Sequence, residues 1–250
     1  MQQLTAEDQG GPREPVLWVT GGGSGMGRAS VLSAASKGWR VALSGRRPDR
    51  VRAVAREVEA SGGEVLALPG DVRSIDDVTA SAAAIERRWG RLDGLVLAAG
   101  LNAPRRGWED QDLQELGDIV ETNLVSVARV VQLALPELRR SAGTIVVVSS
   151  YAGWRFSPGA GVAYSASKTA LASLCQSLNA QEAGSGVRAC HLCPGDVDTD
   201  FLAQRPEVPG AEARSVMLTA EDVARAVQFV LDSPAHVRVD ELVISPVSQH

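Results

Sequence analysis

The sequence predicts an α/β fold with a doubly wound parallel sheet, and two observations support this prediction. Short runs of Val, Leu and Ile alternate with Ala-rich helical stretches along the whole chain, as in a parallel sheet covered by helices on both faces. The chain has 250 residues with 44% hydrophobic content, which is enough to bury one full core. We therefore expect one domain over residues 14–250, preceded by a mobile tail over residues 1–13.

The expected elements alternate in order along the chain. The expected strands are the short apolar runs, which lie near residues 15–20, 40–44, 64–69, 93–98, 143–149, 187–193 and 240–245. The expected helices are the intervals between them, at about 25–37, 48–61, 74–89, 110–140, 163–184 and 219–232. Pro136 should bend or end the fourth helix, because its ring clashes with the preceding turn. Residues 199–217 show little periodicity, so we expect a lid over a site at the strand C-termini.

The charge and composition exclude several classes of function. The formal net charge is -5 and the Lys and Arg residues are scattered, so we expect no nucleic-acid partner. No stretch approaches the ~20 apolar residues needed to span a bilayer, and the polar N-terminus lacks the features of a signal peptide. We therefore expect a cytoplasmic protein with no membrane partner.

The segment Cys190-His-Leu-Cys193 has the CxxC spacing of some metal and redox sites. It lies in an expected strand, where positions three apart point to opposite faces, and the sequence offers no second ligand pair. Together with Cys175 these cysteines are too few for a disulfide framework, which agrees with a reducing compartment. We expect buried cysteines and no metal site.

A glycine-rich segment, residues 20–27, follows the first apolar run and precedes the first expected helix. Glycines there would let the backbone turn tightly and let a ligand approach, while the free N–H groups at the helix start favour an anion. A plain turn is the alternative, since glycine-rich loops also occur without a ligand. The residues expected to hold a nucleotide pyrophosphate are Gly21, Gly23, Ser24, Gly25, Met26 and Gly27.

Tyr164 and Lys168 form a candidate acid/base pair. They stand four residues apart on an expected helix, so both side chains share one face. An ammonium ~4 Å from a phenolate would lower the pKa of tyrosine by roughly three units at an effective dielectric of about 20. An ordinary solvated pair is the alternative. Ser149 and Ser150 end the apolar strand 144–148 and place a hydroxyl where doubly wound folds bind ligands.

In this order, these motifs and a later Pro194-Gly195 resemble the short-chain dehydrogenase/reductase family over nearly the whole chain. The resemblance implies a Rossmann-like domain with a seven-stranded sheet in the order 3-2-1-4-5-6-7, and a homo-oligomer, a homotetramer or a dimer. It also implies a catalytic tetrad and further dinucleotide contacts. The implied tetrad is Asn123, Ser150, Tyr164 and Lys168, and all of these except Ser150 would also contact the cofactor. The further cofactor contacts that the resemblance implies are Asp71, Val72, Gly100, Pro194, Gly195, Val197 and Thr199.

The chain departs from the family pattern in two places. The family's NNAG segment is here Leu97-Ala98-Ala99-Gly100, so Ala98 replaces the usual Asn. The resemblance implies that this Asn mainly braces the centre of the sheet. The spacing from Ser150 to Tyr164 is one residue longer than is frequent in the family, so Ser149 is an alternative to Ser150. We favour Ser150, because the Ala-Gly that follows matches the family's turn.

The resemblance implies hydride transfer between a nicotinamide and a carbonyl or carbinol carbon of a small molecule. Tyr164 would be the general acid/base and Ser150 would bond the substrate oxygen. Lys168 would lower the pKa of Tyr164 and bind the nicotinamide ribose, and Asn123 would hold a water in a proton relay. A dinucleotide-binding regulator without turnover, and a dehydratase or epimerase of the same fold, are the alternatives.

The end of the second strand favours NADP over NAD as the cofactor. Position 45 is Gly, where an NAD-preferring member would carry the acid that bonds the ribose hydroxyls. Arg46 and Arg47 follow and could bind a 2′-phosphate through charge-assisted hydrogen bonds. Asp49 is a rival acid for NAD, but after Pro48 it is typical of the first turn of a helix. An Arg46 that stacks on adenine would be compatible with either cofactor.

The C-terminal segment 233–246 resembles NADP-dependent 3-hydroxy acid or serine dehydrogenases of bacteria. This favours a secondary alcohol or ketone as the substrate, a hydroxy acid among the candidates. We expect Trp154 and Phe156 to line the substrate cleft and Arg155 to receive a carboxylate. Packing positions for the aromatic residues, and a surface or interface position for the arginine, are the alternatives.

Overall fold

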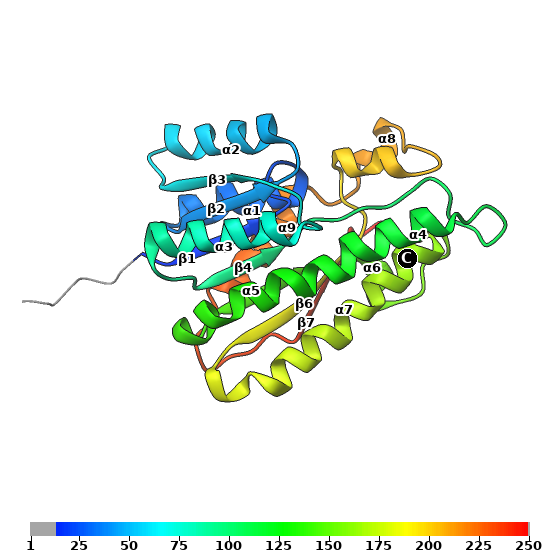
Figure 1. The fold of residues 1–250 in the computed structure, drawn as a ribbon. Coiled ribbons are helices and arrows are strands. Elements are labelled where there is room, and N and C mark those ends of the chain that lie inside the picture. Colours follow the sequence, from blue (N-terminus) through cyan, green and yellow to red (C-terminus); the bar gives the residue numbers. More distant parts are fainter. Residues whose placement is uncertain (1–13, 250) are drawn as a thin grey trace, which may run out of the picture.

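A parallel sheet of seven strands forms the centre of the structure, a computed structural model that describes residues 14–249 (Figure 1). The strand order is β3-β2-β1-β4-β5-β6-β7, so the predicted fold class and strand order are confirmed. The predicted tail at residues 1–13 lies outside the described residues. The strands are β1 (Val16–Thr20), β2 (Arg40–Gly45), β3 (Val65–Pro69), β4 (Gly94–Leu97), β5 (Thr144–Val148), β6 (Arg188–Pro194) and β7 (Glu241–Ile244).

The strand order determines where a ligand can bind. The chain runs outward from β1 to β2 and β3, and then returns to the other side of β1 with β4 (Figure 1). The register pairs Thr20, the last residue of β1, with Ser44 on one side and Leu97 on the other. Because the connections leave β1 and β4 in opposite directions, a crevice opens at their carboxyl ends, where doubly wound folds bind ligands.

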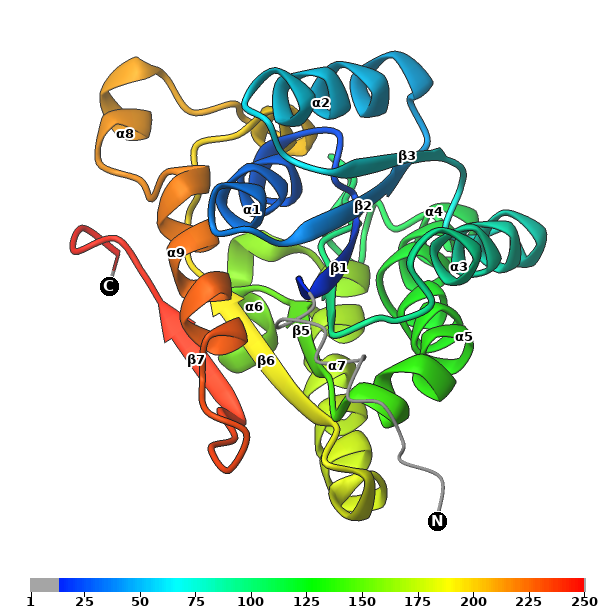
Figure 2. The same cartoon turned by 90° about the vertical axis from the view of Figure 1, so that its left-hand side faces the viewer.

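Helices cover both faces of the sheet, as the alternating sequence pattern predicts (Figure 2). The longer helices are α1 (Gly25–Ser36), α2 (Pro48–Ala60), α3 (Ile75–Trp89), α4 (Leu113–Val120), α5 (Ser126–Ser141), α7 (Val162–Gln181) and α9 (Ala220–Leu231). Residues of α1, α2 and α9 pack on one face, and residues of α3, α5 and α7 pack on the other. In β1, Val16 and Trp18 face one core cluster while Leu17 and Val19 face the other, so this strand is buried on both sides.

The predicted helix 110–140 forms as α4 and α5, joined by a π-helical turn, η1 (Glu121–Val125). The Asp112 side chain accepts hydrogen bonds from the backbone N–H groups of Gln114 and Glu115 and so caps the start of α4. Pro136 does not end the helix, which continues to Ser141. Pro136 lies on the exposed side of α5, where water can bind the backbone carbonyl that its ring leaves free.

The continuous helical run Leu113–Ser141 is long and apolar enough to cross a membrane by length and composition alone. In this structure its apolar residues pack into the protein: Val127, Val131 and Leu138 belong to the core cluster on one face of the sheet. The run ends with Arg139 and Arg140 in its last turn. We therefore interpret it as a core-packing helix.

Residues 199–217, predicted as an irregular lid, contain two short helices. These are η4 (Asp200–Gln204) and α8 (Ala211–Ser215). Asp196 forms an ion pair with Arg205, and Asp198 forms one with Arg214, so the segment is tied to the end of β6. Its first residues border the crevice at the carboxyl ends of the strands.

Candidate active site

The glycine loop between β1 and α1 has no room for larger residues. Gly21 and Gly25 have φ angles of +67° and +50°, which lie in the left-handed region that favours glycine. A Cβ at Gly27 would lie 2.3 Å from the carbonyl oxygen of Gly21, and a Cβ at Gly21 would lie 2.7 Å from the backbone nitrogen of Ala99. The backbone of the loop is therefore held close to the first turn of α1 and to the end of β4, as a phosphate-binding turn requires.

A cleft of about 510 Å³ opens over this loop at the carboxyl ends of the strands. It reaches from the end of β2 to α7 and is bordered by the lid. The predicted site residues that line it are Gly21, Gly23, Ser24, Gly25, Met26, Gly27, Arg46, Arg47, Val72, Gly100, Tyr164, Lys168 and Thr199. Those absent from its lining are Asp71, Asn123, Ser150, Pro194, Gly195 and Val197.

A group of arginines borders the end of the cleft near β2. Arg46 and Arg47 lie there, and Arg47 donates a hydrogen bond to the Ser24 hydroxyl at 3.1 Å. Arg50, one turn further along α2, also lines the cleft. Arg50 was not among the residues predicted from the sequence, although its spacing of three residues from Arg47 places both on one side of a helix. Asp49 is exposed in the first turn of α2 and does not line the cleft.

Asp71 and the residues after β6 support the walls of the cleft. Burial opposes ionisation of Asp71, but hydrogen bonds and charge from Arg73 keep its carboxyl pKa below the usual value. Val197 is buried and forms a β-bridge with Leu218, while Gly195 lies against the Gln249 side chain. Of the predicted cofactor contacts in residues 194–199, only Thr199 lines the cleft, close to Gly25.

Tyr164 and Lys168 lie together on α7 at the inner end of the cleft, as their spacing predicts. The Lys168 ammonium donates a hydrogen bond to the carbonyl of Val148 at 2.9 Å and lies 5.7 Å from the centre of the Tyr164 ring. Burial lowers the pKa of Lys168 to about 8. The ammonium is thus held at the end of β5, near the ring of Tyr164.

The pKa of Tyr164 shifts in the direction opposite to the one predicted. Burial raises it, whereas a hydrogen bond from Ser150 and the charges of Arg106 and Arg205 lower it. Lys168 is not among the groups that act on this pKa. The prediction counted the attraction between the two side chains and left out the loss of hydration, which in this structure is the larger effect.

Ser149 and Ser150, the two candidate serines, have different contacts at the end of β5. Ser150 is the residue before the short helix α6 (Tyr151–Trp154); its hydroxyl accepts a hydrogen bond from the backbone N–H of Ala152 and acts to lower the pKa of Tyr164. The Ser149 hydroxyl is buried and donates a hydrogen bond to the backbone carbonyl of Lys168 at 3.2 Å. Ser149 thus fastens β5 to α7 and also lines the cleft, whereas Ser150 acts on the pKa of Tyr164 without being among the lining residues.

Asn123 lies in the π-helical turn η1 and is fully buried. Its side-chain oxygen accepts a hydrogen bond from the backbone N–H of Leu101, and its amide nitrogen donates to the Leu101 carbonyl and to the Ser167 hydroxyl. Asn123 therefore joins the end of β4 to α7 behind the cleft. π-Helical turns of this kind occur frequently at functional sites, but no feature of the sequence predicted this one.

The predicted substrate-binding aromatic residues do not line the cleft, so that expectation is wrong. Phe156 is 85% exposed. The guanidinium of Arg155 stacks over the Trp154 ring at 4.0 Å, and neither residue contributes to the lining. Instead Phe201 of the lid lies 6.1 Å from Tyr164 between ring centres, and Gln204 lines the cleft beside it.

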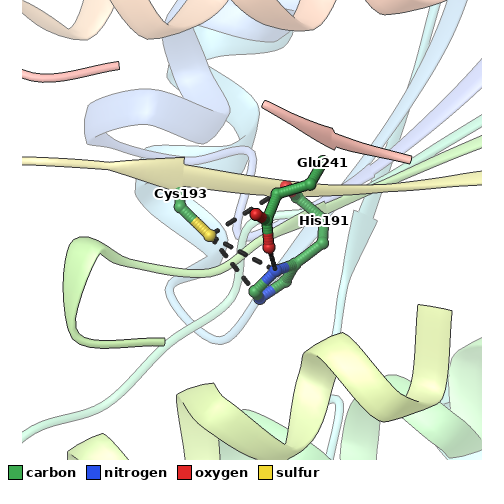
Figure 3. Close-up of side chains that lie close together, drawn as sticks. All are labelled: His191, Cys193 and Glu241. Atoms are coloured by element: carbon green, nitrogen blue, oxygen red, sulfur yellow. Dashed lines mark hydrogen bonds and ion pairs between the residues drawn. The ribbon is translucent and has the colours of Figure 1, made fainter. Parts of the chain in front are cut away.

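His191, Cys193 and Glu241 form a compact cluster on β6 and β7 (Figure 3). The Nδ1 atom of His191 lies 3.1 Å from a carboxylate oxygen of Glu241 and 3.3 Å from the sulfur of Cys193. One nitrogen, one sulfur and one oxygen are ligand types that zinc accepts. Cys190, which the CxxC spacing pairs with Cys193, faces the opposite core. The cluster could not be predicted from the sequence, because it depends on the β6–β7 register that pairs His191 with Glu241.

The fold and the cleft define a class, the dinucleotide-binding α/β proteins. Within this class, residues 15–209 match the short chain dehydrogenase family. The chain belongs to the short-chain dehydrogenase/reductase family, and it is an oxidoreductase of CH–OH groups that uses a nicotinamide dinucleotide.

Individual relatives agree with this assignment. The sulfoacetaldehyde reductase of Chromohalobacter salexigens is 33% identical over 93% of this chain and 94% of that protein. The alcohol dehydrogenase of Thermococcus sibiricus complexed with 5-hydroxy-NADP is 30% identical, with a TM-score of 0.86 over 95% of this chain and 99% of that one. A closed serine dehydrogenase complexed with NADP+ is 27% identical, with a TM-score of 0.86 over 94% of this chain and 96% of that one.

Proposed function

We propose that this protein is an NADP-dependent dehydrogenase/reductase of small secondary alcohols or ketones, with Tyr164 as its general acid/base. The observation that carries the proposal is that Tyr164 and Lys168 both line the inner end of the cleft, with the Lys168 ammonium 5.7 Å from the centre of the Tyr164 ring. The names of two relatives, which give sulfoacetaldehyde and serine, support a small polar substrate such as a hydroxy acid.

The residues present fit a dinucleotide. A cradle of glycines leaves open the space that Cβ atoms at Gly21 and Gly27 would fill, and the first turn of α1 offers N–H groups to a pyrophosphate. The cofactor, when bound, supplies or accepts the hydride. In the direction of reduction, the Tyr164 hydroxyl donates a proton to the substrate oxygen, and Ser150 holds that oxygen in place.

The remaining members of the implied tetrad have supporting roles in this proposal. Lys168 keeps a positive charge behind the phenol and offers N–H groups to the nicotinamide ribose. Asn123 holds the Leu101 backbone and, through Ser167, the start of α7, so its main effect is to position Tyr164.

The arginines near β2 favour NADP over NAD. Arg46, Arg47 and Arg50 all line the cleft, and the described residues place no carboxylate among the lining residues at this end. Guanidinium groups bind a phosphate through charge-assisted, bidentate hydrogen bonds. We further propose, by resemblance to the family, that the chain acts in the cytoplasm as a homotetramer or dimer.

Purified protein tests the proposal directly. Incubated with a panel of ketones, keto acids and aldehydes, it should oxidise NADPH in preference to NADH, followed by the loss of absorbance of the reduced cofactor. The double substitution Arg46→Ala and Arg47→Ala should lower kcat/KM for NADPH by roughly 10- to 100-fold, because charge-assisted hydrogen bonds to the phosphate are lost.

A matched control is Arg52→Ala on the same helix, because Arg52 is exposed and does not line the cleft. This variant should keep the cofactor preference of the unaltered protein. A higher kcat/KM with NADH than with NADPH in the unaltered protein would refute the proposed preference. A protein that oxidises neither cofactor with any carbonyl compound would refute the proposed activity.

A further inference from the structure

Two neighbouring arginines in the loop between β4 and α4 have opposite electrostatic environments. Arg105 is 49% exposed and forms ion pairs with Asp112 and Glu115, so its charge is balanced. Arg106 is half-buried and forms no ion pair within residues 14–249. Since moving a cation out of water without a counterion costs free energy, the position of Arg106 calls for an explanation.

Hydrogen bonds hold the Arg106 guanidinium where three segments meet. Its Nε atom donates to the carbonyl of Ala103 at 3.0 Å, Nη1 to that of Gly159 at 2.6 Å, and Nη2 to that of Gln204 at 3.0 Å. A guanidinium carries five N–H groups. One N–H on each Nη atom is therefore left over, and all the bonding partners found in the described part of the chain are neutral.

The same contacts place Arg106 behind Gln204 at the substrate side of the cleft, where Arg106 itself is not among the lining residues. Its backbone carbonyl accepts a hydrogen bond from Val162, the first residue of α7, two positions before Tyr164. Gln204, to which Nη2 donates, lines the cleft together with Phe201 and Tyr164. The charge of Arg106 also acts on Tyr164, whose pKa it lowers. Arg106 is thus an unbalanced cation next to the proposed acid/base group.

Other cations near Tyr164 are already engaged. Arg205 forms an ion pair with Asp196, and Lys168 donates to Val148 and has been assigned to the cofactor side. The arginines that suit a cofactor phosphate lie at the opposite end of the cleft, near β2. Arg106 is therefore the cation left for the substrate.

We propose that Arg106 binds an anionic group of the substrate, so that the enzyme acts on small carbonyl compounds or alcohols that carry a carboxylate or a sulfonate. This inference rests on the proposed function and adds to it the chemical class of the substrate and the residue that recognises it. The two remaining N–H groups, one on each Nη atom, suit the two oxygens of such a group, which arginine binds in a bidentate manner. Arg155, which the sequence suggested for this role, stacks on Trp154, whereas Arg106 is bonded to Gln204, which lines the cleft.

A purely structural role is the competing explanation, because the bond to Gln204 also fastens the lid. The two roles differ in one measurable respect. Loss of a residue that only fastens the lid should lower kcat/KM for every substrate equally, whereas loss of a residue that binds an anion should lower it mainly for negatively charged substrates. Matched pairs of an acid and its methyl ester, which differ in charge and by one methyl group, therefore separate them.

The experiment uses glyoxylate, 4-oxobutanoate and acetoacetate, each paired with its methyl ester, and NADPH. In the unaltered protein, kcat/KM should be higher for the acid than for the ester in the best pair. The substitution Arg106→Gln should lower kcat/KM for that acid by roughly 10- to 100-fold, mainly through KM, because charge-assisted hydrogen bonds are lost. The loss for the ester should be much smaller, and Arg106→Lys should restore part of the preference for the acid.

Arg105→Gln is the matched control and should leave both members of each pair unchanged. Inorganic sulfate provides a test that does not depend on a folded Arg106→Gln variant: it should inhibit the unaltered protein in competition with the acid, and more weakly in Arg106→Lys. Equal losses for acid and ester, no competition by sulfate, or reduction of the esters alone would each overturn the assignment of Arg106 while the proposed activity stands. Loss of all NADPH oxidation with every compound would instead refute the proposed activity.

Discussion

At the scale of single residues, burial sets the charge states of the two groups on α7. The sequence correctly placed Tyr164 and Lys168 on one helix face, because side chains four residues apart on a helix are neighbours. It could not give the direction of the tyrosine pKa shift. That direction depends on how much water the fold removes from the phenol and on Arg106 and Arg205, which come from segments distant in the sequence.

The pKa of Lys168 predicts a pH dependence of carbonyl reduction. Because burial lowers this pKa to about 8 from 10.5, the ammonium is present below about pH 8 and is lost above it. Tyr164 keeps its proton over this whole range, since burial raises its pKa. We expect kcat/KM for reduction to be constant from pH 6 to 7.5 and to fall by up to about tenfold per pH unit above 8.

Unfolding would not account for this predicted fall in kcat/KM above pH 8. A lysine with a folded pKa below its unfolded pKa binds fewer protons in the folded state, so its contribution to stability rises with pH between about 8 and 10.5. Circular dichroism at each pH provides the control. A rate that stays constant to pH 10, with the fold intact, would show that the charge of Lys168 is not needed.

At the scale of elements, close packing of α1 on the end of β1 depends on Gly27. A Cβ there would lie 2.3 Å from the carbonyl oxygen of Gly21, so the helix or the loop must shift to accept it. We expect Gly27→Ala to destabilise the protein by roughly 1–3 kcal/mol, the usual cost of overpacking, and to weaken NADPH binding. Thermal unfolding and a fluorescence titration with NADPH measure the two effects.

Gly117 offers the matched comparison in another helix. It is exposed on α4, and a Cβ there would meet nothing within 4 Å. Gly117→Ala should be neutral or stabilising by up to about 1 kcal/mol, the difference in helix propensity. If Gly27→Ala unfolded at the same temperature as the unaltered protein and bound NADPH equally well, the proposed role of the glycine loop would be wrong.

At the scale of the whole molecule, the periodic parts of the fold were predictable and the contacts between distant loops were not. The strands predict well because both faces of each are covered, which produces nearly continuous apolar runs such as Val16–Val19. The π-helical turn at Asn123 left no such pattern, and an exposed Pro136 was tolerated inside α5.

The candidate site shows the same division. Motifs that act within one turn or helix, such as Gly21 to Gly27 and Tyr164 with Lys168, were found from the sequence. Phe156 was assigned to the cleft because it follows Ser150 closely along the chain, yet it is exposed. The contact between Arg106 and Gln204 joins residues 98 positions apart, and only the folded chain brings them to one side of Tyr164.

The central claim is that Tyr164 transfers a proton to the substrate oxygen within an intact dinucleotide cleft, and Tyr164→Phe tests it most directly. The variant keeps the ring beside Phe201 and removes only the hydroxyl that bonds with Ser150. With NADPH and the best carbonyl substrate, we expect kcat to fall by roughly 10²- to 10⁴-fold, while the dissociation constant for NADPH stays unchanged. A variant that binds NADPH and reduces the substrate at the original rate would contradict the account.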